Sequence, residues 1–268
     1  MMFGDIAPDH RARKRFGQNF LTDRSVIDRI IRAIAPSAND TLIEIGPGRG
    51  ALTNELIDSG AMVHLVELDR DLGEQWQRRT GTKLQVHIND ALRFDFSTLA
   101  PAATRLRVVG NLPYNISSPL LFHLLRFGSQ IEDMHFMLQR EVVERMAAEA
   151  ATADYGRLTV MIQYHCAVEN LFEVPASAFS PAPKVVSAVV RLTPRPYPGT
   201  PLRSHKTLST VVTQAFSQRR KTVRNALRTL IGADALTALD IDPGVRPENL
   251  DIDDFVRIAN AVMPEQIR

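Results

Sequence analysis

The sequence is poor in cysteine and in aromatic residues: among 268 residues there is one cysteine, Cys166, and aromatic side chains make up 6%. A single cysteine excludes an intrachain disulfide and a cysteine-rich metal site, and it suits a reducing compartment. We expect Cys166 to be a buried apolar residue, because no motif places a base beside it. The seven histidines show no metal-ligand spacing, so we expect no bound metal.

Long hydrophobic runs are also missing from the sequence. No apolar stretch is long enough to span a bilayer, and the N-terminus is polar and basic, unlike a secretory signal. We therefore expect a cytoplasmic protein with no membrane partner. The hydrophobic fraction of 44% is ordinary for a globular protein, and the length suggests one large domain, alone or with a small one.

Acidic residues are absent from positions 174–233, which contain ten lysines and arginines. The net charge of the whole chain is only +2, so this imbalance is local. Such a segment favours a polyanion as partner, although a solvated helix face would explain a shorter run of charge. On a continuous helix, several of these cations would share or flank one face: Arg219, Arg220, Lys221, Arg224 and Arg228.

Strand-like and helix-like segments alternate over positions 41–193, which predicts a seven-stranded, mostly parallel sheet with helices on both faces. A helix before them begins near Thr22 or Asp23 and ends at Pro36, and positions 16–21 read as a loop. The expected strands are 41–45, 62–67, 84–88, 106–110, 134–139, 168–174 and 185–193, and the expected helices are about 51–59, 70–79, 117–127, 140–151 and 155–167.

The composition changes at positions 194–201, a proline-rich segment that reads as a linker. Beyond it the apolar residues follow helical spacing, with a break at Ser217. We therefore expect an α/β domain over residues 1–200 and a small helical domain over residues 201–268.

Three consecutive strands end in residues that suit an adenosine-shaped ligand. Gly46 belongs to a glycine-rich turn between strand and helix, where the backbone can approach a ligand closely. Glu67 follows about twenty residues later and can accept hydrogen bonds from both ribose hydroxyls. Asp90, after the third strand, can accept from the adenine amine. Each acid taken alone could be a solvated residue at a strand end. Because the acids end the strands that follow the glycine-rich turn, their positions favour a ligand site instead.

The fourth strand ends in Gly110-Asn111-Leu112-Pro113-Tyr114. An asparagine oxygen can accept from an amine and a tyrosine can stack on a ring, which suits a nucleobase, although asparagine and proline are also ordinary turn formers. No phosphate-binding Gly-Lys-Ser/Thr follows the glycines, and we find no proton-transfer residue for a nicotinamide enzyme. S-adenosylmethionine therefore explains the four strand ends better than a dinucleotide does.

Seven motifs give the chain a family resemblance: residues 13–21, 44–50, 67–69, 90–91, 110–117, 178–181 and 215–222. Through them the chain resembles the class I methyltransferases that use S-adenosylmethionine, and more narrowly the ribosomal RNA adenine N6,N6-dimethyltransferase family. The resemblance covers nearly the whole chain. It implies a Rossmann-like α/β fold with a seven-stranded, mostly parallel sheet and a small C-terminal all-helical domain.

The resemblance also implies a function and residue roles. The activity would be dimethylation of two adjacent adenosines in the 3′-terminal hairpin loop of 16S ribosomal RNA, in the small subunit or its late precursor, with a role in ribosome biogenesis. Apart from the resemblance, we expect a monomer. Contacts to the cofactor would come from Asn19, Leu21, Gly46, Glu67, Asp90 and Asn111. The catalytic positions would be Asn111, Leu112, Pro113, Tyr114 and Phe179, and RNA would be bound by Arg13, Lys14, Arg15, Arg219, Arg220, Lys221, Arg224 and Arg228.

Alternatives remain at this point. Without the resemblance, Phe179 reads as a core aromatic. An antibiotic-resistance methyltransferase that modifies large-subunit RNA would share the Asn-Leu-Pro-Tyr element, and an assembly factor would need the RNA contacts more than the chemistry. A nicotinamide dehydrogenase is the most distant alternative.

Overall fold

The computed structural model describes residues 6, 12–13, 17–79, 81–99, 105–218 and 220–263. Within these residues, seven strands form one sheet in the order β4-β3-β2-β5-β6-β9-β7. The pairs from β4 to β6 are parallel and β9 is antiparallel to β6, which confirms the predicted sheet. The strands are β2 (Thr41–Ile45), β3 (Met62–Glu67), β4 (Leu84–Ile88), β5 (Leu106–Asn111), β6 (Ile131–Gln139), β7 (Cys166–Val174) and β9 (Ser187–Pro194).

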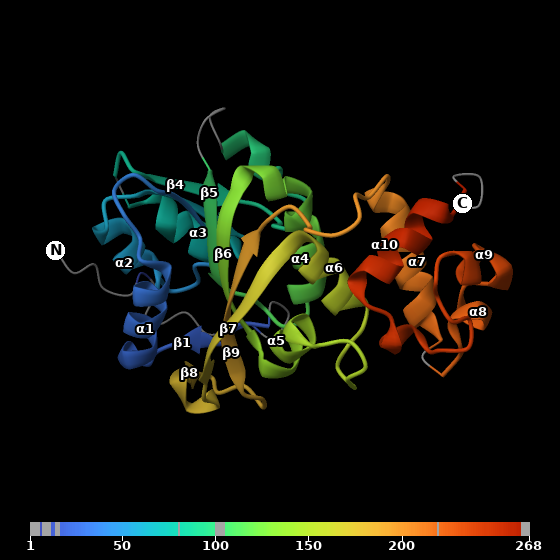
Figure 1. Ribbon diagram of the computed structural model, residues 1–268. Coiled ribbons are helices and arrows are strands. Elements are labelled where there is room, and N and C mark those ends of the chain that lie inside the picture. The colour runs from blue at the N-terminus through green and yellow to red at the C-terminus, as the bar shows by residue number, and fades with distance from the viewer. Residues whose placement is uncertain are drawn as a thin grey trace. The chain divides into compact units, whose positions relative to one another are not determined.

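Helices follow most of the parallel strands, and Figure 1 shows α1 and α2 on one side of the sheet and α4 on the other. Helix α1 begins where Asp23 accepts hydrogen bonds from the backbone N–H groups of Ser25 and Val26, as its capping position predicted. The helices are α1 (Arg24–Ile34), α2 (Thr53–Asp58), α3 (Arg70–Gln77), α4 (Ser117–Leu124) and α5 (Arg140–Ala147), with 3-10 turns at Phe96–Leu99, Leu125–Gln130, Ala176–Ala178 and Pro247–Asn249.

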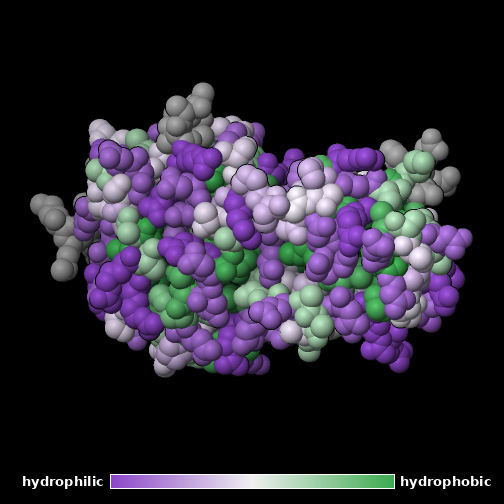
Figure 2. All heavy atoms as spheres, in the orientation of Figure 1, coloured by the Kyte–Doolittle hydropathy of each residue, from purple (hydrophilic) through white to green (hydrophobic). Residues whose placement is uncertain are grey.

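The core lies between the sheet and the helices. Ile30 of α1 and Leu56 of α2 belong to one buried cluster with Leu42, Val109 and Met137 from three different strands. Burial of this apolar surface is what orders the strands beside one another. Figure 2 shows hydrophilic side chains over most of the visible surface, with small apolar areas between them.

A second, two-stranded sheet joins β1 (Phe20–Leu21) to β8 (Phe179–Ser180). The two strands run antiparallel, with Phe20 opposite Ser180 and Leu21 opposite Phe179. The prediction of a loop over positions 16–21 is therefore wrong at its end. A strand of two residues is too short to show any periodicity, and its partner is distant in the sequence.

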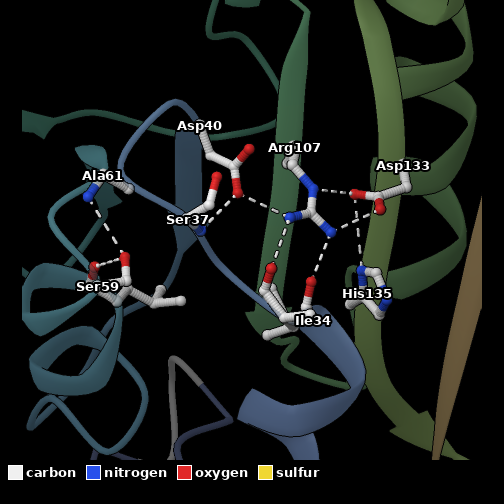
Figure 3. Close-up of polar contacts among 10 residues, drawn as sticks. Ile34, Ser37, Asp40, Ser59, Ala61, Arg107, Asp133 and His135 are labelled. Atoms are coloured by element: carbon white, nitrogen blue, oxygen red, sulfur yellow. Dashed lines mark hydrogen bonds and ion pairs between the residues drawn. The ribbon is translucent and has the colours of Figure 1, made fainter.

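A buried arginine braces the sheet at the edge where β5 begins (Figure 3). The Arg107 guanidinium donates to both carboxylate oxygens of Asp133, at 3.0 and 2.8 Å, and to Asp40 at 2.8 Å. It also donates to the backbone oxygen of Ile34 at 2.6 Å. Arg107 thus connects β5 with β6 and with the last turn of α1.

The chain divides into two compact units. One comprises the described residues up to Val143 together with Glu169–Pro194, and the other comprises Glu144–Val168 and the residues from Arg195 onward. The second unit is helical: α6 (Arg157–His165), α7 (His205–Ser217), α8 (Val223–Ala226), α9 (Ala233–Ala238) and α10 (Ile252–Ala261). Helix α6 therefore groups with the C-terminal helices, which a boundary at residue 200 does not anticipate; that boundary stays a prediction.

Cys166 is buried, as predicted, and burial raises the pKa of its thiol to about 12. In the part of the chain that the structure describes, no three histidine, cysteine or acidic residues gather as a metal site. The same residues contain no helix with the length and apolarity needed to cross a membrane.

Candidate active site

A cavity of about 520 Å³ lies at the carboxyl ends of β2, β3, β4 and β5. Parallel sheets bind their ligands at this edge. Most of the predicted site residues line it: Asn19, Leu21, Gly46, Glu67, Asp90, Asn111, Leu112, Pro113 and Tyr114. The structure thus brings the expected cofactor contacts and the Asn-Leu-Pro-Tyr turn to one place, while their roles stay predictions.

The loop after β2 leaves room for a ligand against its backbone. Gly46 and Gly48 have φ values of 67° and 54°, which side chains with a Cβ rarely adopt. The Gly46 N–H donates to the backbone oxygen of Val66 at 2.9 Å and so ties the loop to the end of β3. A Cβ added to Gly46 would meet nothing within 4 Å. The open cradle over this peptide fits a nucleoside-containing ligand.

Gly110 is required for a different reason. A Cβ at this position would lie 2.6 Å from the backbone oxygen of Ile45. Strand β5 therefore passes β2 closely just where both strands open into the cavity, and only glycine permits that approach. This close packing fixes where Asn111 enters the cavity.

Glu67 is almost fully buried, and its carboxylate is held from two sides. Gly48 N–H donates to Oε2 at 3.1 Å and Asp69 N–H donates to Oε1 at 2.8 Å. Burial nevertheless raises the pKa of Glu67 to about 7, because desolvation outweighs these hydrogen bonds. The Glu67 side chain lines the cavity, and the backbone N–H groups of Gly48 and Asp69 determine its orientation.

Asp90 lies in the turn after β4 and is half-buried. Its Oδ1 accepts a hydrogen bond from Leu92 N–H at 2.9 Å, which orients the carboxylate. Two acids at neighbouring strand ends therefore line one cavity, as the spacing of Glu67 and Asp90 predicted.

Asn111 ends β5 and connects the cavity with the N-terminal segment. Its Nδ2 donates to the backbone oxygen of Asn19 at 2.9 Å. The adjacent Leu112 N–H donates to Met137 O at 3.2 Å, which holds the turn against β6. The residues of the Asn-Leu-Pro-Tyr turn are thus anchored by hydrogen bonds to two other segments.

Tyr114 lines the cavity, and its hydroxyl lies 2.8 Å from Oγ of Ser187. Partial burial raises the pKa of the phenol, so the hydroxyl is neutral at physiological pH. Sequence reasoning did not single out Ser187, because no motif shows that the first residue of β9 meets this turn.

Phe179 does not line the cavity in the described structure. It is 5% exposed and belongs to the same buried cluster as Leu21 and Val174. Its backbone pairs with Leu21 across the β1–β8 sheet, so it is close to the segment that does line the cavity. The expected role as a second aromatic wall stays a prediction.

Glu44 is a further cavity residue to which sequence reasoning assigned no role. It is buried, and Thr53 Oγ1 donates to its Oε2 at 2.6 Å. Burial raises the pKa of Glu44 to about 8, and the nearby Glu67 adds to the effect. An acid in the apolar run Thr41–Ile45 was the signal that could have identified it.

Of the basic arm predicted to bind RNA, Arg13 is described, and Lys14 and Arg15 lie outside the described residues. The Arg13 guanidinium bonds to Asp69 at 2.7 Å and to Asp71. Gln18 adds a bond from Nε2 to Asp69 at 3.1 Å, so the segment is fastened beside the end of β3. These contacts give Arg13 a structural partner in addition to the predicted one.

The C-terminal cations do not share one helix face, and that prediction is wrong. Helix α7 ends at Ser217, and α8 spans only Val223–Ala226, so Arg220 and Arg228 lie outside both. The backbone N–H of Arg224 donates to Pro243 O at 3.2 Å, and this tertiary contact replaces a continuous helix. The described cations are nevertheless exposed: Arg220, Lys221, Arg224 and Arg228; Arg219 lies outside the described residues.

Comparison with known proteins finds a family model and relatives that all carry the description of a ribosomal RNA methyltransferase or dimethylase. A family model described as ribosomal RNA adenine dimethylase matches residues 9–263. The ribosomal RNA small subunit methyltransferase A of Pseudomonas aeruginosa is 55% identical over 253 residues, which are 94% of each chain. The protein of the same name from Hahella chejuensis is 56% identical over 255 residues, covering 94% of this chain and 93% of the relative.

Solved structures extend the similarity to the fold. A dimethyladenosine transferase from Plasmodium falciparum superposes with a TM-score of 0.75 at 26% identity, over 89% of this chain and 95% of that one. The 23S rRNA methyltransferase ErmE superposes with a TM-score of 0.64 at 27% identity, over 91% and 99%.

Proposed function

The chain belongs to the ribosomal RNA adenine dimethylase family, and on that premise we propose that it dimethylates N6 of two adjacent adenosines in the 3′-terminal hairpin loop of 16S ribosomal RNA. Membership makes the chain a methyltransferase that uses S-adenosylmethionine, with the class I fold that its motifs predicted. The small-subunit substrate is supported by the relatives named for it. They share 55–56% sequence identity with this chain, whereas the large-subunit enzyme ErmE shares 27%.

The residues of the cavity fit the cofactor. The open backbone at Gly46 would accommodate the nucleoside portion, the Glu67 carboxylate would accept both ribose hydroxyls, and Asp90 would accept from the adenine amine. Asn19 and Leu21 would contact the cofactor from the N-terminal segment. When bound, S-adenosylmethionine supplies a methyl group on a sulfonium, so the bonding electrons stay on sulfur when the methyl leaves.

The Asn-Leu-Pro-Tyr turn would prepare the target amine. N6 of adenosine is a weak nucleophile because its lone pair is delocalised into the ring. Hydrogen bonds from N6–H to Asn111 Oδ1 and to the Leu112 carbonyl would favour a pyramidal nitrogen and stabilise the positive charge that develops on it. Each methyl gained forms one N–C bond and releases one N6 proton to water. Tyr114 would hold the unstacked base, and the family resemblance assigns a second aromatic wall to Phe179.

The partner we propose is the small ribosomal subunit or its late precursor, met in the cytoplasm by a monomer of this chain with a role in ribosome biogenesis. The exposed cations of the helical unit would neutralise RNA phosphates, together with the basic arm around Arg13. The described residues of positions 174–233 present no acid that would oppose them.

One observation supports the proposal above the others: a single cavity joins Glu67 and Asp90 to Asn111 and Tyr114. The experiment supplies unmethylated small and large subunits separately, with labelled S-adenosylmethionine, and identifies the modified nucleoside by mass spectrometry. We expect N6,N6-dimethyladenosine in small-subunit RNA. Label in large-subunit RNA alone would favour the resistance-type activity instead. A strain carrying Glu67→Ala, compared with a full deletion, separates the chemistry from any assembly role.

A further inference from the structure

The Tyr114 hydroxyl and Ser187 Oγ form a hydrogen bond inside the protein, at 2.8 Å. Ser187 has no exposed surface, so water cannot replace the bond from that side. Tyr114 itself lines the cavity beside Asn111. A ring that faces the ligand site is therefore fastened at its far end to the sheet.

The serine end of this bond is rigid. Ser187 is the first residue of β9 and pairs with Gln139, the last residue of β6. The backbone N–H of Arg140 donates to Val186 O at 3.0 Å, immediately before it. Two strands and the start of α5 thus fix the position of the serine.

The tyrosine end is equally constrained. Tyr114 lies in a turn in which Pro113 O accepts hydrogen bonds from Ile116 N–H and from Ser117 Oγ, both at 3.1 Å. With its backbone fixed, the ring keeps rotational freedom only about its side-chain torsions. A hydrogen bond to the hydroxyl removes most of that freedom, so the ring face is held at one position in the cavity.

We propose that Ser187 is a positioning residue, which pins the Tyr114 ring as a wall of the nucleobase site and thereby determines how completely singly methylated adenine is carried on to the dimethyl product. The inference rests on the proposed function. To that function the inference adds a residue that governs the ratio of monomethylated to dimethylated product. Ser187 touches no reacting atom and acts through Tyr114.

The second methyl transfer depends on the wall more than the first. Unmodified adenine offers two N6–H donors to Asn111 Oδ1 and the Leu112 carbonyl, whereas the monomethylated amine offers one. With one hydrogen bond fewer, the base depends more on stacking against Tyr114 for its orientation. A loose ring therefore slows the second transfer more than the first, and monomethyladenosine accumulates.

The test compares Ser187→Ala with the unchanged protein on unmethylated small subunits, with limiting enzyme and equal total methyl incorporation. Nucleosides are quantified by mass spectrometry. We expect the ratio of N6-methyladenosine to N6,N6-dimethyladenosine to rise by about twofold to tenfold, the effect of losing one hydrogen bond. Tyr114→Phe removes the same bond without changing β9 and should shift the ratio in the same direction.

The control is Thr159→Val in the helical unit. Thr159 is as buried as Ser187, and its Oγ1 donates to Arg145 O at 2.5 Å and accepts from Gly156 N–H at 3.0 Å. The variant thus loses at least as much buried hydroxyl bonding, and we expect the ratio to stay unchanged. The double variant Ser187→Ala/Tyr114→Phe should give a ratio no higher than either single variant, because all three variants lack the same hydrogen bond. An unchanged ratio in both folded single variants overturns the inference. Absence of methyladenosine with the unchanged protein would instead overturn the proposed function.

Discussion

The side chain of Asn111 donates from Nδ2 to the backbone oxygen of Asn19, at 2.9 Å. A carbonyl oxygen only accepts, so the NH2 end of the amide faces Asn19. The Oδ1 end is then the acceptor that Asn111 offers to a ligand in the cavity. One side chain thus holds the N-terminal segment and presents an acceptor at the proposed site of methyl transfer.

Replacement of Asn111 tests these two tasks separately. Asn111→Ala removes both, and we expect kcat for methyl transfer to fall by about 10²–10³-fold, as for other lost transition-state hydrogen bonds. Asn111→Asp keeps an acceptor but replaces the donor to Asn19 with a charged oxygen, so its kcat should fall below that of the unchanged protein and exceed that of the alanine variant. Asn39→Ala, an exposed asparagine elsewhere, is the control. Equal activity of the Asp and Ala variants would contradict the acceptor role.

Binding of S-adenosylmethionine should depend on the ionisation of Glu67, whose pKa burial raises to about 7. Only the charged carboxylate accepts two ribose hydroxyls while also holding two backbone N–H groups. The group gains its proton as the pH falls through 7, so Kd should rise about tenfold from pH 8 to pH 6. Calorimetry measures this, and Glu67→Gln should bind weakly with no such dependence. A flat profile for the unchanged protein would contradict the assignment.

Glu44 makes the stability of the fold depend on pH. Its folded pKa of about 8 lies above the ordinary 4.5, so between these values the folded state keeps a proton that the unfolded chain has released. The free energy of unfolding therefore falls as pH rises through this window. Glu44→Gln removes this titrating group. Between pH 5 and pH 8 the Tm of the variant should therefore fall by at least ~2–4 °C less than the Tm of the unchanged protein does. Parallel curves from thermal circular dichroism would contradict the buried, protonated state.

Arg107 should contribute far more to stability than an exposed arginine does. Arg107→Met leaves the Asp133 carboxylate without its guanidinium partner, and we expect the free energy of unfolding in urea to fall by about 3 kcal/mol. The control is Arg70→Met, which removes an exposed pair with Glu74 and should cost less than about 0.5 kcal/mol. Similar losses in the two variants would show that the brace at the start of β5 is unimportant.

Affinity for the small subunit should weaken steeply with salt. If the basic residues neutralise about six phosphates, the slope of log affinity against log salt is roughly −4 to −5. Alanine at Arg220, Lys221, Arg224 or Arg228 should each flatten the slope by about 0.7–0.9, whereas Arg70→Ala should not. A salt-insensitive affinity would rule out the phosphate contacts.

The centre of the sheet was predictable because β2, β3 and β5 are buried along almost their whole length. The expected bounds of β2, β3 and β4 match the structure, since each is a short segment rich in apolar residues that ends at a turn or a charged residue. The strand ends then follow from topology, because parallel strands meet at one edge and bring Glu67, Asp90 and Asn111 together. The local sequence was therefore sufficient to predict that these three residues lie at one edge of the sheet.

Contacts between distant segments could not be predicted in the same way. The break at Ser217 was predicted and α7 ends there, but nothing in the spacing of Arg220, Arg224 and Arg228 shows that the next helix is confined to Val223–Ala226, where the backbone contact comes from Pro243. The partner of Tyr114 was likewise invisible, because Ser187 looks like any other serine at the start of a strand. Tertiary contacts decided both cases.

The small β1–β8 sheet has a consequence for the order of folding. Its flanking hydrogen bonds, such as that from Thr22 Oγ1 to Ala178 O, join residues 156 positions apart. Closing so long a loop costs entropy before two short strands return any energy, so this pairing forms after the main sheet has brought the segments together. The segment that carries Asn19 therefore reaches the cavity late, and a nascent chain released before residue 180 has all four strand ends but an incomplete ligand site.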